Sequence, residues 1–258
     1  MLGNKHFYHR TIRKTVVAFG TLFNDIQLVR YTQDLSQEKE RFRVPLSYGS
    51  KEKYLTRLTS DPDLVKSIGI AVPRISFEMT GMSYDSSRKQ ISTLANFSSN
   101  SNISLVDKQF VPVPYNFDFS MSIFVRNTED GTQILEQILP YFTPDFTVTV
   151  NFIPSMDRKY DVPIILNSVN TTTEYEGDMT TTRMITWDLE FTAKGYIWPS
   201  ITPSKYIRTS NGNLYIETVD AASNTKATAV SVSPNPSTAN VDDEFGFAES
   251  ITRWPDTL

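Results

Sequence analysis

Three carboxylates at alternate positions of predicted strands are the candidates for acid–base chemistry. Asp118 lies in the alternating apolar and polar run 115–125, and Asp188 and Glu190 lie two residues apart in the run 185–193. Residues two apart in a strand share a face, so Asp188 and Glu190 point the same way. Two carboxylates facing each other across a cleft form the catalytic pair of most glycoside hydrolases. The same alternation is also typical of an exposed sheet face or a subunit contact, which is the interpretation we prefer.

The other residues that could hold a metal or act as a nucleophile do not complete a site. The chain has no cysteine, and its two histidines, His6 and His9, are three residues apart with no third zinc ligand beside them. The acidic residues of the segment 174–178 lack the spacing of a calcium loop and are typical of a hairpin tip. The sequence has no glycine-rich phosphate loop, no zinc-protease helix motif and no nucleophile elbow. We therefore predict no catalytic residue, no metal and no cofactor.

Aromatic residues leave a sugar-binding surface open as an alternative. Trp187, Trp198 and the many tyrosines could stack on sugar rings, although strand phase places most of them in a core. Asn96, Asn102 and Asn170 each begin an N-x-[ST] triplet, which we interpret as chance because the N-terminus lacks the apolar stretch of a secretory signal. A β-rich carbohydrate-binding module and a carboxylate-pair hydrolase are the two alternative functions.

The first elements that must position these residues are short. Apolar residues spaced three and four apart predict an amphipathic helix over residues 11–23. Residues 25–31 and 42–48 are predicted strands joined by a polar loop. Ser50 is the expected N-cap of a short helix that ends before Pro62.

Longer strands follow in the middle of the chain. Strict alternation predicts strands over residues 75–84 and 115–125, and the alternation slips by one at Gly81, which predicts a β-bulge there. A second phase change at Gly195 predicts another bulge. Thr128 is the expected N-cap of a helix that Pro140 ends. Three more strands are predicted, over residues 146–152, 160–169 and 185–193.

This order of elements predicts an α+β fold. We expect a mixed, mainly antiparallel sheet with a few helices packed on one face, in a single domain over residues 1–203. The polar stretch between Ser86 and Pro112 predicts a mobile loop. Residues 204–258 predict an extended C-terminal arm that is partly disordered or reaches another subunit.

Charge is distributed unevenly along the chain. The net charge is −4, yet the first 57 residues contain eleven basic and five acidic side chains. The overall balance argues against specific nucleic-acid binding. No run of about 18 apolar residues could span a bilayer, so we also expect no membrane contact and a protein made in a cytoplasm. Opposite charge at the two ends of a molecule suits head-to-tail docking between protein surfaces.

Five segments together resemble the tail sheath stabiliser and completion proteins of large contractile-tailed bacteriophages. In chain order they are FRVPLSYGSKE (42–52), VPRISFEMTGMSYD (72–85), MSIFVRNTED (121–130), ILEQILPYF (134–142) and WDLEFTAKGYIWP (187–199). ILEQILPYF is the most specific of them. The resemblance covers about residues 10–199. The sequence departs from the family pattern in the loop 96–104 and after Pro203.

The resemblance implies a structural virion protein with a tail-terminator-like subunit and no enzymatic activity or cofactor. It implies a homohexameric ring that caps the top of the tail, holds the sheath extended and offers a surface to the neck of the capsid. The implied partners are the tail sheath protein, the tail tube terminator and the neck proteins that join tail to capsid.

Two groups of side chains are our hypothesis for protein interfaces. Arg41 and Arg43 share a strand face, and Lys51 and Lys53 open the helix after it, so these cations are expected to meet an acidic partner surface. Aromatic residues near the end of the chain are expected to anchor the arm to a neighbouring subunit. The remaining members of the interface hypothesis are Arg10, Arg13, Lys14, Phe245, Phe247 and Trp254.

Overall fold

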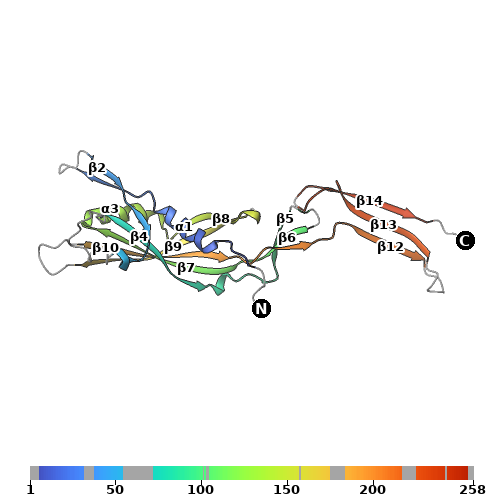
Figure 1. Ribbon diagram of the computed structural model, residues 1–258, viewed down its shortest axis with the longest axis horizontal. Helices are drawn as coiled ribbons and strands as arrows, with labels where there is room; N and C mark the ends of the chain where they lie inside the picture. Colours follow the sequence, from blue (N-terminus) through green and yellow to red (C-terminus); the bar gives the residue numbers. More distant parts are fainter. Residues whose placement is uncertain are drawn as a thin grey trace. The chain divides into compact units, whose positions relative to one another are not determined.

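The computed structural model describes residues 6–31, 38–54, 72–100, 102, 105–156, 158–174, 184–216, 225–241 and 243–254. The chain divides into two compact units (Figure 1). The first unit contains residues 1–90 and 112–198, and the second contains residues 91–111 and 199–258. The segment 91–111 thus belongs with the C-terminal residues, whereas the sequence pattern predicts one boundary at residue 203. The fold is α+β, as predicted, and strands dominate it.

A six-stranded sheet forms the first unit, and its long strands run side by side in Figure 1. The sheet order is β3-β4-β7-β10-β9-β8. Strand β3 pairs in parallel with β4, and the other described neighbours pair antiparallel. The strands are β3 (Leu46–Tyr48), β4 (Arg74–Tyr84), β7 (Val113–Val125), β8 (Asp145–Ile153), β9 (Arg158–Glu174) and β10 (Met184–Ile197).

The register of the central strands gives the sheet one apolar and one polar face. On one face Phe119 lies opposite Met79 on β4 and Phe191 on β10. One residue along, Ser120 lies opposite Glu78 and Glu190 on the other face. This is the alternation that the sequence predicts, because a pleated strand points successive side chains to opposite faces.

The two predicted bulges have different outcomes. The register of β4 against β7 shifts between Met79 and Gly81, which confirms the first bulge. The prediction of a bulge at Gly195 is wrong, because β10 pairs with β7 without interruption through that residue. A Cβ on Gly195 would lie 2.6 Å from Cε2 of Phe117, so this glycine makes room for an aromatic ring.

Helix α1 (Thr11–Leu22) confirms the predicted opening helix. It packs on the apolar face of the sheet through Phe19, whose ring is fully buried and stacks on Phe119 with centroids 4.3 Å apart. The ring of Phe191 meets Phe19 edge-on at 5.3 Å. Edge-on and offset ring pairs of this kind add stability beyond the burial of apolar area.

Helix α3 (Thr128–Ile138) follows β7 and buries Ile134, Leu135 and Ile138. Its N-cap is Asn127, so the prediction of a cap at Thr128 is wrong by one residue. The short 3-10 helix η2 (Leu139–Tyr141) continues from it, with Pro140 ending the regular helix as predicted.

A two-stranded antiparallel sheet of β1 (Gln27–Tyr31) and β2 (Glu38–Arg43) completes the described strands of the first unit. Residues Glu38 to Glu40 belong to the polar loop that the sequence predicts, but pairing with β1 makes them part of strand β2. Residues 51–54 are helical, and the rest of the helix expected before Pro62 lies outside the described residues. The expected hairpin tip between β9 and β10 lies outside them too.

The second unit contains two three-stranded sheets, ordered β11-β6-β5 and β12-β13-β14. The mobile loop predicted between Ser86 and Pro112 is wrong, since this stretch holds the short 3-10 helix η1 (Ser86–Arg88) and a hairpin of β5 with β6. The strands are β5 (Ala95–Ser99), β6 (Leu105–Phe110), β11 (Thr202–Lys205), β12 (Ser210–Ile216), β13 (Thr225–Asn235) and β14 (Gly246–Arg253).

Candidate interaction surface

Cross-strand hydrogen bonds hold the three strand carboxylates on the polar face of the six-stranded sheet. The Asp188 carboxylate accepts a bond from Ser122 at 2.6 Å and pairs with the Lys51 ammonium at 2.7 Å. Ser120 donates to Glu190 at 2.9 Å. Asp118 accepts a bond from the Thr192 hydroxyl at 3.0 Å. These carboxylates tie neighbouring strands together, which is a structural role.

The tryptophans proposed for a sugar platform are packed inside the first unit. Trp198 is 2% exposed, and its ring centroid lies 4.3 Å from that of Tyr160. Helix α3 passes so close to Trp187 that a Cβ on Gly131 would lie 2.6 Å from the indole Nε1. The buried ring of Trp198 is therefore unavailable to stack on a sugar, and Trp187 is half-buried with its indole Nε1 against α3.

The remaining metal candidates are dispersed. His9 lies beside Phe7 in the segment before α1, with ring centroids 5.5 Å apart. Within the described ranges, no three histidine, aspartate or glutamate side chains are grouped to hold a metal ion. No helix in the described part of the chain is long and apolar enough to cross a membrane.

Arg41 and Arg43 lie on the same face of β2, opposite Phe42, as the strand phase predicts. Each guanidinium has an acidic partner within the chain. Arg41 pairs with Glu38 at 2.6 Å and Arg43 pairs with Asp25 at 2.9 Å. The hydrogen bond from Arg41 to Glu38 raises the pKa of the arginine above its usual value. Both arginines keep more than half of their side-chain surface exposed, so they remain accessible to a partner.

Lys51 and Lys53 separate in the structure. Lys51 is turned onto the polar sheet face by its ion pair with Asp188, whereas Lys53 is exposed on the helical segment 51–54. Tyr54 of the same segment lies against Phe124, with ring centroids 6.2 Å apart, and donates to Ser47. Phe124, the one residue of β7 out of phase, is thus buried on the polar face beneath Tyr54.

The basic residues at the start of α1 line a groove beside the edge strand β8. Lys14 donates to the backbone carbonyls of Asn151 and Phe152 and so ties α1 to the end of that strand. Arg10 and Arg13 are exposed on the same groove, which also contains Val17. Arg10 has a positive φ of 58°, so the backbone turns sharply before the helix begins.

The C-terminal aromatic residues are exposed within the second unit. Phe247 is 75% exposed, Phe245 40% and Trp254 42%. The rings of Phe245 and Phe247 lie 5.9 Å apart, and the Lys226 ammonium lies 4.8 Å from the centre of the Trp254 ring. Three exposed aromatic rings, one on β14 and one at each of its ends, are typical of a contact surface.

The register of this sheet places its large apolar side chains on one face, which also contains the charged Glu249 and Arg253. One face contains Val230 opposite Ile251, and Pro234 opposite Phe247. The other face contains small residues, such as Ser231 opposite Ser250. Leu214 on β12 lies opposite Thr228 and joins the apolar face, where it is 64% exposed. Sequence reasoning singled out the aromatic residues but missed this face.

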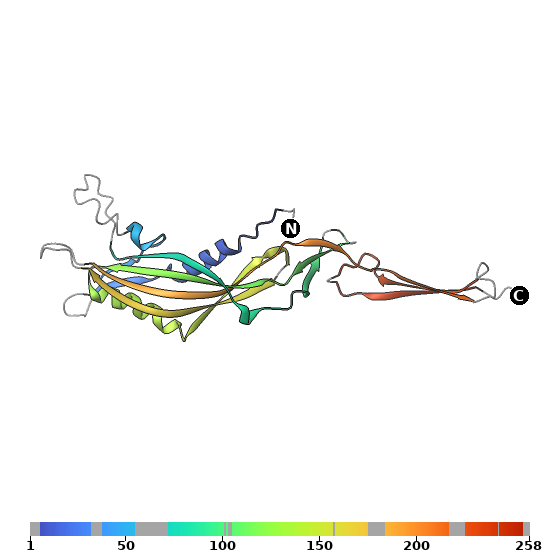
Figure 2. The ribbon, with the colours of Figure 1, turned by 90° about the horizontal axis from the view of Figure 1, so that it is seen from below.

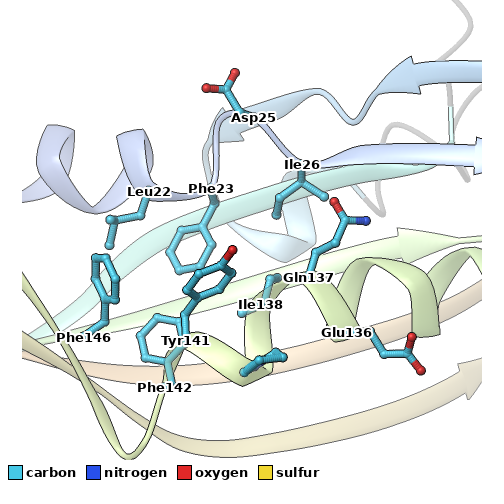
Figure 3. A pocket seen from close by; sticks show the side chains of 11 residues that line it. Leu22, Phe23, Asp25, Ile26, Glu136, Gln137, Ile138, Tyr141, Phe142 and Phe146 are labelled. Atoms are coloured by element: carbon cyan, nitrogen blue, oxygen red, sulfur yellow. The ribbon is translucent and has the colours of Figure 1, made fainter.

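An aromatic pocket of about 510 Å³ lies between the end of α1 and the end of α3 (Figure 3). Phe23, Phe142 and Phe146 line it, and Tyr141 stands at its mouth with 66% of its surface exposed. Ring contacts join the wall, with 6.2 Å between the centroids of Phe23 and Phe142. The other lining residues are Leu22, Asp25, Ile26, Glu136, Gln137, Ile138 and Pro140. Sequence reasoning missed this pocket, although ILEQILPYF contributes much of its lining.

A network on η1 contains the one carboxyl, among the described side chains, whose pKa departs clearly from its ordinary value. Hydrogen bonds from Ser87 and Arg88 hold the pKa of Asp85 well below its usual range. Arg88 pairs with Asp85 at 2.8 Å, donates to Asn116 at 2.8 Å and lies over the Tyr196 ring. The network fixes η1 against the ends of β7 and β10 and gives Asp85 a structural role.

Comparison with known proteins identifies the family. Residues 6–256 match the family model of the T4-like virus Myoviridae tail sheath stabiliser. The chain is 31% identical over 224 residues to the tail completion protein gp15 of Enterobacteria phage T4, which covers 83% of this chain and 80% of that protein. The chain therefore belongs to the tail sheath stabiliser family of T4-like myoviruses, and it is a structural component of the phage tail, not an enzyme.

Proposed function

We propose that this protein forms a homohexameric ring on top of the finished tail. There it caps the last sheath layer, holds the sheath in its extended form and provides the attachment surface for the neck of the capsid. The observation that carries the proposal is the family match, which extends over residues 6–256 and so includes both compact units.

The subunit proposed for this ring is of the tail-terminator type, with a mainly antiparallel sheet and helices on one face. The pairings around β7 and β10 and the contact of α1 with the apolar sheet face support it. Such a subunit has a polar sheet face and exposed aromatic rings left for neighbours, as a closed ring requires.

The proposed partners are the tail sheath protein, the tail tube terminator and the neck proteins. Exposed Arg41 and Arg43 are proposed to face an acidic surface of the last sheath or tube ring, with Lys53 beside the same partner. The sheet β12-β13-β14, which occupies the predicted arm, is proposed to reach a neighbouring subunit through Phe247 and the apolar residues of its face.

Electron microscopy of tails assembled with and without the protein tests the proposal. We expect a sixfold cap on the upper end of extended tails when the protein is present. Tails that lack the protein are expected to lose the extended sheath. A cap of another symmetry, or density at the baseplate end, would overturn the proposed function.

A further inference from the structure

The aromatic pocket has an apolar interior and an acidic rim. Its volume of about 510 Å³ is within the range of ligand pockets in proteins, and it is enough to accept aromatic side chains. Asp25 and Glu136 lie at the edges of the pocket, and Figure 3 shows their carboxylates turned outward from the aromatic rings. Asp25 pairs with Arg43, whereas Glu136 is exposed and makes no ion pair within the described residues.

The segment that precedes α1 has the complementary chemistry. Phe7 is 50% exposed and Tyr8 66% exposed, in residues that form neither helix nor strand. The exposed cations Arg10 and Arg13 follow directly. An exposed aromatic pair beside two cations matches an apolar pocket with a carboxylate rim.

The segment and the pocket lie at opposite ends of α1. The pocket is lined by Leu22 and Phe23 at the C-terminal end, and a helix of 12 residues is about 18 Å long. Figure 2 shows the residues before α1 leading away from the helix, in the direction opposite to α3. A chain therefore presents the segment to one neighbour and the pocket to another.

We propose that Phe7 and Tyr8 of one copy insert into the aromatic pocket of a second copy, with Arg10 and Arg13 facing the carboxylate of Glu136. A contact between two different surfaces of identical subunits is heterologous, and it closes into a ring when its rotation is a fraction of a full turn. The inference rests on the proposed ring and names the contact that joins its subunits.

Phe245 near the C-terminus fits the pocket less well than Phe7 and Tyr8. Phe245 follows directly after Asp243 and Glu244, whose charges would meet Glu136 at the rim. Like charges brought together at an interface oppose binding. Charge complementarity therefore favours the N-terminal segment over Phe245 as the occupant.

Disulfide trapping tests the contact, because the chain has no cysteine of its own. Full-length protein with Tyr8→Cys and Tyr141→Cys is assembled on tails and then oxidised. A disulfide needs Cα atoms within about 7 Å, so bonding reports direct contact between the segment and the pocket. We expect a ladder of linked subunits on a non-reducing gel. The matched control is Tyr8→Cys with Tyr48→Cys, where Tyr48 is also an exposed tyrosine, and it should remain monomeric.

Charge exchange tests the rim. Arg13→Glu and Glu136→Lys should each lower the binding of subunits, and the double variant should restore it, because the pair is then reversed. Glu129→Lys changes the same charge at the other end of α3 and should leave ring formation unchanged. Replacing Phe7 and Tyr8 together by serine should weaken ring assembly roughly tenfold or more, as expected for buried aromatic anchors.

The outcomes separate this inference from the proposed function. Sixfold caps on tails without a linked ladder would overturn the contact and leave the ring in place. A disulfide formed within one chain, seen as a monomer of altered mobility on the gel, would show that the segment fills the pocket of its own chain. That result also overturns the proposed contact. An absence of caps would overturn the proposed function itself.

Discussion

Position 195 requires glycine because the ring of Phe117 leaves no room for a Cβ, and not because the backbone there has an unusual conformation. Its Cβ would lie 2.6 Å from the buried ring of Phe117, and the described glycines have no positive φ. Gly195→Ala should therefore lower the free energy of unfolding by about 1–3 kcal/mol, as overpacking of a core does. Urea denaturation measures the change. The matched control is Gly81→Ala in the same sheet, whose Cβ would be 3.6 Å from Asp118, and an equal loss in both variants would contradict this account.

Asp85 should make the stability of the protein depend on pH in the acid range. Its folded pKa is depressed by Ser87 and Arg88, so its stabilising effect is present above the unfolded pKa of about 4 and is lost as the pH falls through the folded value. Asp85→Asn should lower the urea midpoint at pH 7 and lower it less at pH 3. An equal deficit at the two pH values would show that ionisation of Asp85 does not contribute.

At the scale of elements, the two faces of the sheet β12-β13-β14 should differ in what they do. Phe247 is 75% exposed on the apolar face, so Phe247→Ser should change the unfolding free energy of the chain by no more than about 0.5 kcal/mol. The same substitution should reduce the fraction of tails that carry a cap. Ala248→Ser on the opposite face is the control and should preserve capping. Equal capping by both variants would exclude this face as a contact.

The elements that sequence predicts well are those with one face in the core. Strands β4 and β7 alternate apolar and polar residues because the apolar face packs under α1, and the bulge at Gly81 appears as a slip in that alternation. Strands β5 and β6 were missed because their stability comes from pairing and from polar contacts, such as that of Asn100 with Asp107. Backbone pairing leaves no periodic mark on such polar segments.

The candidate surfaces show the same limit. The interface residues could be predicted from charge and aromatic content, but their ion pairs within the chain could not be predicted. Asp25 and Arg43, for example, are 18 residues apart in the sequence and meet only through the fold. The aromatic pocket combines the end of α1 with the segment 136–146. A pocket that joins distant segments has no local sequence pattern, so it can be recognised only once the folded structure is known.

At the scale of the whole molecule, the basic N-terminal quarter should act in docking through exposed charge. Arg41 and Arg43 pair with Glu38 and Asp25, and exposed pairs of this kind contribute little to stability because water and salt screen them. Both guanidiniums can therefore attract an acidic partner at little cost to the fold. Arg41→Glu with Arg43→Glu should slow the capping of sheaths and make the remaining association less sensitive to salt, because fewer screened attractions remain.

A control variant separates docking from the loss of ion pairs within the chain. Glu38→Gln breaks the pair of Arg41 while it keeps both arginines and leaves Asp25 at the pocket in place, so it should cap sheaths at the normal rate or faster. Stopped-flow light scattering of sheaths at several salt concentrations measures the rates. If the arginine variant caps and stabilises extended sheaths at the normal rate at low ionic strength, electrostatic docking by this quarter of the chain is excluded, since attraction between exposed charges is strongest there.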